Sequence, residues 1–388
     1  MDFNLTEEQE MIRAQVRELA DSFDMDYWRN CDRNHEYPHE YLKTFAEAGW
    51  LGIAIPETYG GAGLDILEAC LLLEEICASG AGTTGASPVH FAIFPPMPVI
   101  KYGNEEQKQR FLPKVASGEI KVGFGVTEPD AGTDTTRIST YAEKVGDEYI
   151  ISGQKVWSTN IKHAQRTLLL ARTTPYEQVD KKTLGMSLFM LDLDSDGIER
   201  SEIEKLGRHA VDSNILTLDH VRVPKEDLIG EEGQGFYHLL AGLNSERLLI
   251  AAEAVGIGRA AIEIGVKYAN ERHVFNRPIG MNQGLQFPLA DAHSKLMAAQ
   301  LLVYKGATMF DQGQPCGAEA NMAKLRAAEA GFEACDVALQ VHGGMGYASE
   351  YHIERLWREM RLYKLAPISQ EMALNYIGQH VLGLPKSY

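Results

Sequence analysis

The first third of the chain has the apolar spacing of helices. One apolar face repeats every three or four residues near the N-terminus and is formed by Ile12, Val16, Leu19 and Phe23. Thr6 and Gln9 precede this face with the spacing of a capping box, in which each side chain satisfies a free backbone N–H group. Turn-forming residues interrupt the pattern at 56–63 and 94–98, and the segment 66–78 between them is again helical. We therefore predict a helical domain over residues 1–119.

The period of the pattern changes after this domain. Short segments rich in Val, Ile, Leu and Phe follow one another at 121–126, 148–152, 167–172, 187–193 and 215–223. Gly146, Gly153 and Gly197 separate some of them. Such segments, bounded by turn residues, are typical of β-strands. We predict a predominantly antiparallel sheet or small barrel over residues 120–230.

Long helical patterns return in the last part of the chain. Segments 246–270, 289–312 and 318–341 contain few helix breakers and many Ala, Leu, Glu and Lys residues. Together with a shorter C-terminal helix they predict a four-helix bundle over residues 231–388. The fold class is therefore multi-domain α+β. Gly256-Ile257-Gly258 begins a match to the dinucleotide-binding fingerprint, but it lies inside a helical pattern, whereas that fingerprint requires a strand-to-helix turn.

Composition and charge narrow the function classes. Of 388 residues, 45% are apolar and 23% charged, which is typical of a soluble globular protein. The formal net charge of -17 disfavours binding to nucleic acid and to anionic membrane surfaces. Five cysteines without a C-x-x-C pair disfavour a disulfide framework or a zinc cluster, and we expect no metal. The acidic N-terminal segment and the lack of a membrane-length apolar run predict a cytoplasmic protein.

Several segments occur in an order that is distinctive as a set. They are PETYGGAGL at 56–64, VTEPDAGTD at 126–134, WSTN at 157–160, ERHVF at 271–275, QVHGGMGY at 340–347 and ERLWRE at 354–359. Together they resemble the acyl-CoA dehydrogenase family over nearly the whole chain. The resemblance implies an N-terminal helical domain, a middle β-domain and a C-terminal four-helix domain, in agreement with the pattern above. It also implies an FAD cofactor, an acyl-CoA substrate and an electron-transfer flavoprotein as acceptor.

The resemblance assigns two groups of residues to the flavin. The first group offers backbone amides, hydroxyls and a stacking ring in the middle domain: Phe124, Val126, Thr127, Gly132, Thr133, Trp157, Ser158 and Thr159. The second group meets the pyrophosphate and adenosine, and there a guanidinium can donate two parallel hydrogen bonds to phosphate: Arg272, Phe275, Gln283, Gln340, Val341, Gly343 and Gly344. Ser369 would add a hydroxyl contact to the flavin. Taken alone, the same residues also fit a turn, a half-buried strand tryptophan and a helix C-cap.

In the family, the second group reaches the FAD of a neighbouring subunit. The resemblance therefore implies a homo-oligomer, usually a tetramer built as two dimers. One departure affects this group, because the family usually has Phe-Gly where this chain has Phe275-Asn276. This departure concerns only the local turn.

The catalytic base is the main departure from the family. Most members place a glutamate in a short loop after the W-R-[DE] helix, and here that slot falls on Pro367. Members of the isovaleryl and long-chain types instead carry the base just before an arginine, early in the first helix of the bundle. This chain has Asn244-Ser245-Glu246-Arg247 there. The resemblance thus indicates Glu246 as the base, with Thr133, Asn244 and Arg247 as substrate contacts. A solvated ion-pair glutamate is the alternative for Glu246.

Pro367 also affects the thioester carbonyl. In the family the backbone N–H of the slot donates to that carbonyl, and proline has no N–H. Three alternatives remain: the amide of Ile368 takes over, the register differs by a residue or two, or the chemistry is not ordinary α,β-dehydrogenation. The last would be elimination, enoyl-CoA reduction or oxygen-dependent oxidation on the same fold. A weakly active acyl-CoA-binding subunit of a mixed oligomer is a further alternative.

Overall fold

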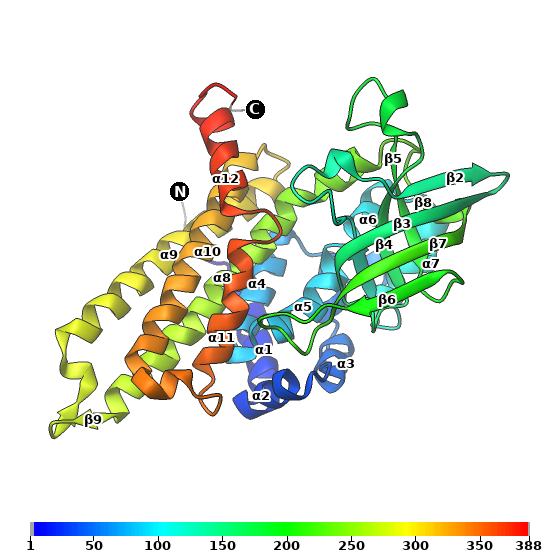
Figure 1. Cartoon of the computed structure of the whole chain (residues 1–388). Coiled ribbons are helices and arrows are strands. Elements are labelled where there is room, and N and C mark those ends of the chain that lie inside the picture. Colours follow the sequence, from blue (N-terminus) through cyan, green and yellow to red (C-terminus); the bar gives the residue numbers. More distant parts are fainter. Residues whose placement is uncertain (1–3, 387–388) are drawn as a thin grey trace.

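The computed structural model describes residues 4–386, and Figure 1 shows that the β-domain comes between two helical parts along the sequence. The capping box at the first helix is confirmed, since Gln9 N donates to Thr6 Oγ1 at 3.2 Å and Thr6 N donates to Gln9 Oε1 at 3.0 Å. Ile12 and Val16 are buried as their spacing predicts. The N-terminal helices are α1 (Glu7–Asp21), α2 (Met25–Asn34), α3 (His39–Glu47), α4 (Ile66–Ile76), α5 (Gly82–Ile93), α6 (Met97–Tyr102) and α7 (Glu105–Ala116).

The middle of the chain forms one mixed, mostly antiparallel sheet. Its main path runs β6-β7-β3-β1-β4-β5-β8, with β2 paired to β3, and β1 pairs parallel to β4. Two of its strands, β2 and β6, were not predicted from the sequence. Most of their residues are exposed, so they lack the apolar alternation of a half-buried strand. The strands are β1 (Val122–Gly125), β2 (Tyr141–Val145), β3 (Glu148–Thr159), β4 (Arg166–Arg172), β5 (Met186–Asp192), β6 (Ile198–Glu202), β7 (Ser213–Pro224) and β8 (Leu228–Ile229).

Long helices build the C-terminal part. They are α8 (Gly235–Glu271), α9 (Gln283–Asp311), α10 (Gly317–His342), α11 (Ile353–Met360) and α12 (Gln370–Tyr376). A small hairpin, β9 (His273–Val274) with β10 (Arg277–Pro278), joins α8 to α9. Gly256 and Gly258 lie within α8, and a Cβ atom would lie 2.2 Å from Glu74 O at the first and 2.5 Å from a Leu296 methyl at the second. These glycines therefore permit close helix packing and do not bind a dinucleotide.

The arrangement of the domains sets the place of the site. Figure 1 shows the sheet on one side of the molecule and the β9–β10 hairpin at the opposite end of the bundle. One apolar core is continuous through the N-terminal helices and the bundle, and a second lies within the sheet. Helix α5 packs against both α8 and β1, so it lies at the junction of all three parts. Within residues 4–386, no helix has the length and apolar content that a membrane crossing requires.

Candidate active site

Glu246 lies on α8 with the properties of a general base. Its side chain is buried, and its Oε2 atom has no hydrogen-bond partner among the described residues. Burial raises the pKa of Glu246 to about 7, against the opposing positive charges of His90, Arg247 and Lys324 and with a small contribution from Glu253. A carboxyl group that titrates near neutrality and has an unused oxygen is suited to accept a proton from a bound substrate. The solvated ion-pair alternative is therefore disfavoured.

A buried hydrogen-bonded group lies directly behind Glu246. His90 on α5 has its Nδ1 atom 2.7 Å from Glu253 Oε1 and its Nε2 atom 4.0 Å from Glu246 Oε1. Tyr363 donates its hydroxyl proton to Glu253 Oε2. His90 and Glu253 were not predicted from the sequence. The spacing of Glu246 and Glu253 could have indicated Glu253, since residues seven apart lie on the same face of a helix.

Two further cations, Arg247 and Lys324, act on Glu246 through their charge. Arg247 donates to Asn244 Oδ1 at 2.9 Å, so two of the three residues expected to meet substrate are in contact. Lys324 on α10 is fully buried and donates to the carbonyl oxygen of Ile368 at 2.5 Å. Burial lowers the pKa of Lys324 to about 8. Lys324, also missed from the sequence, thus ties α10 to the loop that contains the usual position of the base.

That loop lies between α11 and α12 and exposes Pro367. Ser369 caps α12 by accepting from Met372 N at 3.3 Å, and a hydroxyl that accepts one hydrogen bond can still donate another. The ammonium group of Lys364 lies 5.0 Å from the centroid of the Phe332 ring. The loop therefore offers a hydroxyl and backbone groups at this slot but no carboxylate before Glu371.

The loop at 126–133 is held in place by a buried ion pair. Lys155 Nζ lies 2.7 Å from Glu128 Oε1 and donates to Val126 O at 3.2 Å. Glu128 also accepts from the backbone N–H groups of Ser139 and Thr140. Val156 N donates to Thr127 O at 2.9 Å, which ties the loop to β3. Glu128, within the motif, is thus a structural residue that orients the neighbouring positions.

Three positions of the first flavin group have properties that contacts with the rest of the chain do not explain. Ser158 is 1% exposed, and its Oγ atom has no partner among the described residues. Trp157 beside it is 57% exposed and has a φ of 60°, at a bulge between β3 and β7. A Cβ atom on Gly132 would meet nothing within 4 Å, so neither packing nor a positive φ requires glycine there. An unpaired hydroxyl, an exposed aromatic ring and open space beside backbone fit a flavin.

The rest of the first group adjoins these residues. Phe124 on β1 contacts Phe94, with ring centroids 5.0 Å apart. Thr159 accepts from Arg208, which also donates to Ser87 on α5, at 3.2 and 3.3 Å. This arginine links the strand that carries Ser158 to the helix that carries His90.

The second flavin group lies at the opposite end of the same chain. Arg272 ends α8, and its N–H donates to Tyr268 O at 2.9 Å. His342 stacks on the same Tyr268 with ring centroids 4.1 Å apart, which brings the 340–344 segment beside Arg272. Phe275 is 94% exposed on the hairpin, and Gln283 begins α9. Figure 1 shows this end, at β9, far from the sheet, so one chain does not bring the two groups together.

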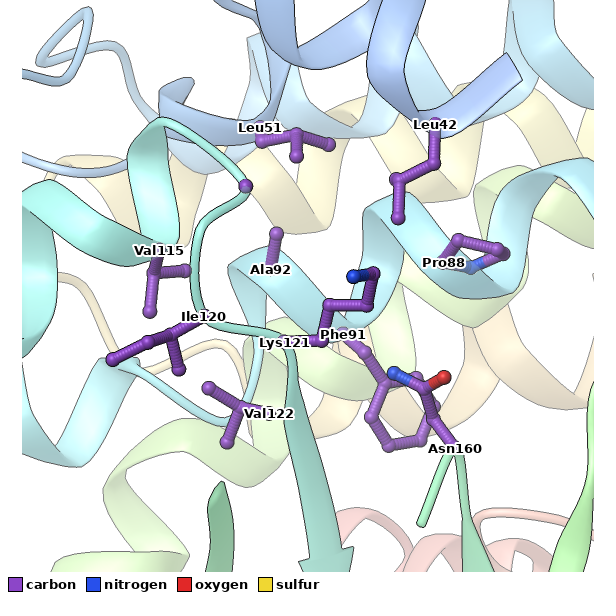
Figure 2. Close-up of a pocket in the computed structure, with 11 residues that line it drawn as sticks. Leu42, Leu51, Pro88, Phe91, Ala92, Val115, Ile120, Lys121, Val122 and Asn160 are labelled. Atoms are coloured by element: carbon purple, nitrogen blue, oxygen red, sulfur yellow. The ribbon is translucent and has the colours of Figure 1, made fainter. Parts of the chain in front are cut away.

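A small cavity lies between α3, α5 and β1 (Figure 2). Its volume is about 10 Å³, which is room for roughly one water molecule. Phe91 and Asn160 both line its wall (Figure 2). The Asn160 Oδ1 atom has no partner among the described residues. The cavity is too small for an acyl chain.

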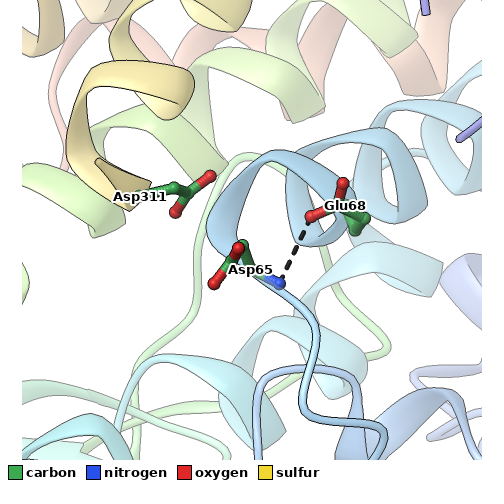
Figure 3. Close-up of side chains that lie close together, drawn as sticks. All are labelled: Asp65, Glu68 and Asp311. Carbon is green, nitrogen blue, oxygen red and sulfur yellow. Dashed lines mark hydrogen bonds between the residues drawn. The ribbon is translucent and has the colours of Figure 1, made fainter. Parts of the chain in front are cut away.

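Three acidic residues, Asp65, Glu68 and Asp311, lie together at the start of α4 (Figure 3). Asp311, at the end of α9, accepts from Ile66 N at 2.9 Å and Leu67 N at 3.0 Å. Glu68 accepts from Asp65 N at 3.2 Å. These bonds satisfy free N–H groups at a helix start, which is the function of a cap. We interpret the cluster as a structural cap that joins α9 to α4.

Known proteins match the chain from end to end. Three family models match in succession: acyl-CoA dehydrogenase, N-terminal domain, over residues 6–119, middle domain over 123–221 and C-terminal domain over 233–382. Acyl-CoA dehydrogenase FadE12 of Mycobacterium tuberculosis is 38% identical over 387 residues, which cover 99% of this chain and 98% of that protein. Acryloyl-CoA reductase (NADH) of Anaerotignum propionicum is 33% identical over 98% of this chain and 96% of its own. The structure of a glutaryl-coenzyme A dehydrogenase glutaryl-CoA complex matches with a TM-score of 0.95 and 34% identity, covering 100% of this chain and 98% of that one.

Proposed function

The chain belongs to the acyl-CoA dehydrogenase family and is an FAD-dependent oxidoreductase, and we propose that it removes two hydrogens from Cα and Cβ of an acyl-CoA thioester with Glu246 as the base. The proposal rests on the buried carboxyl group of Glu246. Its Oε2 atom has no hydrogen-bond partner among the described residues, and its pKa is raised to about 7. A base needs a pKa near the working pH and an oxygen free to receive the proton. No carboxylate occupies the usual loop position, where Pro367 stands.

In the proposed reaction the Glu246 carboxylate accepts the α-proton, and the electron pair of that C–H bond forms the Cα–Cβ double bond. Bound FAD would supply the acceptor for the hydride that leaves Cβ. Arg247, held by Asn244 at 2.9 Å, contributes positive charge beside the base and the thioester. The first flavin group, including Ser158 and Trp157, would hold the ring, and Thr133 would meet substrate. The two electrons then pass to an electron-transfer flavoprotein.

The thioester carbonyl needs a hydrogen-bond donor as the α-proton leaves. Pro367 has no N–H to offer, and loss of one such donor costs on the order of 10²–10³ in rate. We propose the backbone N–H of Ile368 as the replacement. The hydrogen bond from Lys324 to the Ile368 carbonyl oxygen, at 2.5 Å, supports this. It holds the carbonyl group of Ile368 in place and leaves the N–H group of the same residue for the thioester.

We also propose a homo-oligomer, with a tetramer built as two dimers as the expected form. The two flavin groups lie at opposite ends of one chain, so a complete site would combine the sheet of one copy with the Arg272 end of another. The exposure of Phe275 supports this, since a large apolar side chain that is 94% exposed is suited to an interface.

A second candidate is reduction of an enoyl-CoA on the same site. The acryloyl-CoA reductase relative favours it. In that direction protonated Glu246 would deliver a proton to Cα. Anaerobic titration of the purified flavoprotein against a panel of saturated acyl-CoAs, and of the reduced protein against the matching enoyl-CoAs, separates the two. Faster oxidation of saturated thioesters supports the dehydrogenase. Failure of every saturated thioester to bleach the flavin contradicts it.

A further inference from the structure

The contacts behind Glu246 link two helices through one imidazole. Glu246 and Glu253 lie about two turns apart on α8, and His90 reaches both from α5. The distances are 4.0 Å from Nε2 to Glu246 Oε1 and 2.7 Å from Nδ1 to Glu253 Oε1. All three side chains are buried. The proposed reaction does not by itself require this arrangement.

Glu253 and Tyr363 fix the orientation of the imidazole ring. Burial raises the pKa of Tyr363 well above its usual value, so its hydroxyl stays protonated and donates to Glu253. A carboxylate only accepts hydrogen bonds, so the Nδ1 atom of His90 carries the proton it shares with Glu253. Each oxygen of Glu253 therefore has one donor. With Nδ1 held in this way, Nε2 is directed to the base.

The charge on His90 follows from the same contacts. Burial alone would lower its pKa, but the charge and hydrogen bond of Glu253, together with the charge of Glu246, outweigh burial and leave the pKa of His90 raised. The positive charge of Arg208, from the loop before β7, acts in the opposite sense. An imidazolium beside a carboxylate favours the ionised form of that carboxylate.

Other cations face Glu246, but their hydrogen bonds go elsewhere. Arg247, on the same helix, donates to Asn244 Oδ1, and Lys324, from α10, donates to Ile368 O. Among the described residues, His90 is the one cation within ion-pair distance of the Glu246 carboxylate. Its ring is thus the nearest counter-charge to the base.

We propose that His90 is a positioning residue for Glu246, which supplies, through an imidazolium held by Glu253, the counter-charge that keeps the base ionised before it accepts the α-proton. The proposal rests on the proposed function, in which Glu246 is the base. It distinguishes His90 from a residue that merely fills the junction of α5 and α8, because a filling residue would leave the titration of Glu246 unchanged.

The first test is the pH profile of flavin reduction by the holoenzyme. The substrate is whichever of butyryl-, octanoyl- and isovaleryl-CoA bleaches the wild type fastest under anaerobic conditions. His90→Gln places a neutral amide near the Nε2 position, and His90→Asn places one near Nδ1. Both should move the acidic limb of the rate profile upward by about one pH unit, which is about a tenfold lower rate on that limb. His163→Gln, whose ring stacks on Tyr37, is the matched control and should overlay the wild type.

The second test needs no turnover. Thermal midpoints are measured across pH for the wild type, His90→Gln, Glu246→Gln and the double variant. Removing His90 should raise the pKa of Glu246 in the folded protein, so the pH-dependent effect of Glu246→Gln should start at the same pH but continue to about one unit higher in the His90→Gln background. His90→Asn replaces His90→Gln in this cycle if the larger variant does not fold.

The outcomes separate the two claims. Unshifted rate and stability profiles in a folded His90 variant, with Glu246→Gln inactive, overturn the role of His90 alone. Normal flavin reduction by Glu246→Gln overturns the proposed function, whatever the His90 variants do. Upward shifts in both His90 variants, with an unshifted His163→Gln, support the proposal.

Discussion

Lys155 and Glu128 form a buried ion pair beneath the 126–133 loop, with Nζ and Oε1 2.7 Å apart. Lys155 is fully buried on β3, and Glu128 lies within the motif that the sequence analysis assigned to the flavin. The pair connects the strand that carries Trp157 and Ser158 to the loop that carries Thr127. A flavin site built on these two segments would therefore depend on this buried contact.

Loss of this pair is expected to reduce both stability and flavin retention. Lys155→Met leaves the Glu128 carboxylate buried without its partner, which costs about 3–5 kcal/mol when a buried pair is broken. Thermal unfolding and the flavin-to-protein absorbance ratio after gel filtration measure the two effects. Lys162→Met, at an exposed lysine near Glu202, is the control and should change neither. Full flavin content in Lys155→Met would show that the Lys155–Glu128 ion pair is not needed to hold the flavin.

Glu246→Gln is expected to stabilise the protein at high pH. The pKa of Glu246 is about 7, above its usual 4.5, so between these values the folded state binds more protons than the unfolded state. The stability of the wild type therefore falls as pH rises through this window, and the loss is complete above pH 7. Glutamine avoids this loss, which corresponds to about 3 kcal/mol.

Unfolding at pH 5 and pH 8 tests this stability prediction. The advantage of Glu246→Gln over the wild type should grow between the two values. Glu263→Gln, on the exposed face of the same helix, should show no such growth. An advantage of equal size at both values would mean that Glu246 titrates normally.

Subunit mixing tests whether Arg272 acts on the flavin of another copy. In a mixed dimer of Arg272→Gln and Glu246→Gln, one site combines an intact Glu246 with an intact Arg272 from the partner copy. Co-expressed variants should therefore recover activity that neither has alone, up to about a quarter of that of the wild type, since random pairing makes half of the dimers mixed and one of the two sites in each mixed dimer is complete. If Arg272 acted within its own chain, every site would contain one defect and no activity would return.

A base at the usual loop position should partly replace Glu246. Pro367→Glu introduces both a carboxylate and a backbone N–H at the slot. Combined with Glu246→Gln, it should reduce flavin faster than Glu246→Gln alone. Pro367→Gln with Glu246→Gln restores the N–H without the carboxylate and is the matched control. Equal rates in the two double variants would show that the loop does not reach the substrate.

The sequence predicted the elements that have strong apolar periodicity. The long helices α8, α9 and α10 and the buried strands β4 and β5 lie where their patterns indicated. Strands β2 and β6 did not show the signal, because most of their side chains face solvent and are held by pairing to β3 and β7. Backbone pairing across a sheet leaves no local pattern.

The candidate site likewise contains one residue that the sequence indicated and others that it did not. The sequence indicated Glu246 through its context in a family, and the structure adds the burial that raises the pKa of its carboxyl group. His90 and Lys324 were not predicted, because each comes near enough to act on Glu246 only after helices distant in the sequence pack together. Tertiary contacts of single polar residues have no periodicity to read, whereas the apolar faces that create those contacts do.

Anaerobic reduction of the bound flavin in Glu246→Gln, by the acyl-CoA that bleaches the wild type fastest, is the most direct test of whether Glu246 is the base. The variant is expected to purify with full flavin content and to bleach about 10²–10⁴-fold more slowly than the wild type, the usual contribution of a general base. Glu263→Gln should bleach at the wild-type rate. Reduction of the Glu246→Gln flavin at that same rate would show that Glu246 is not the base.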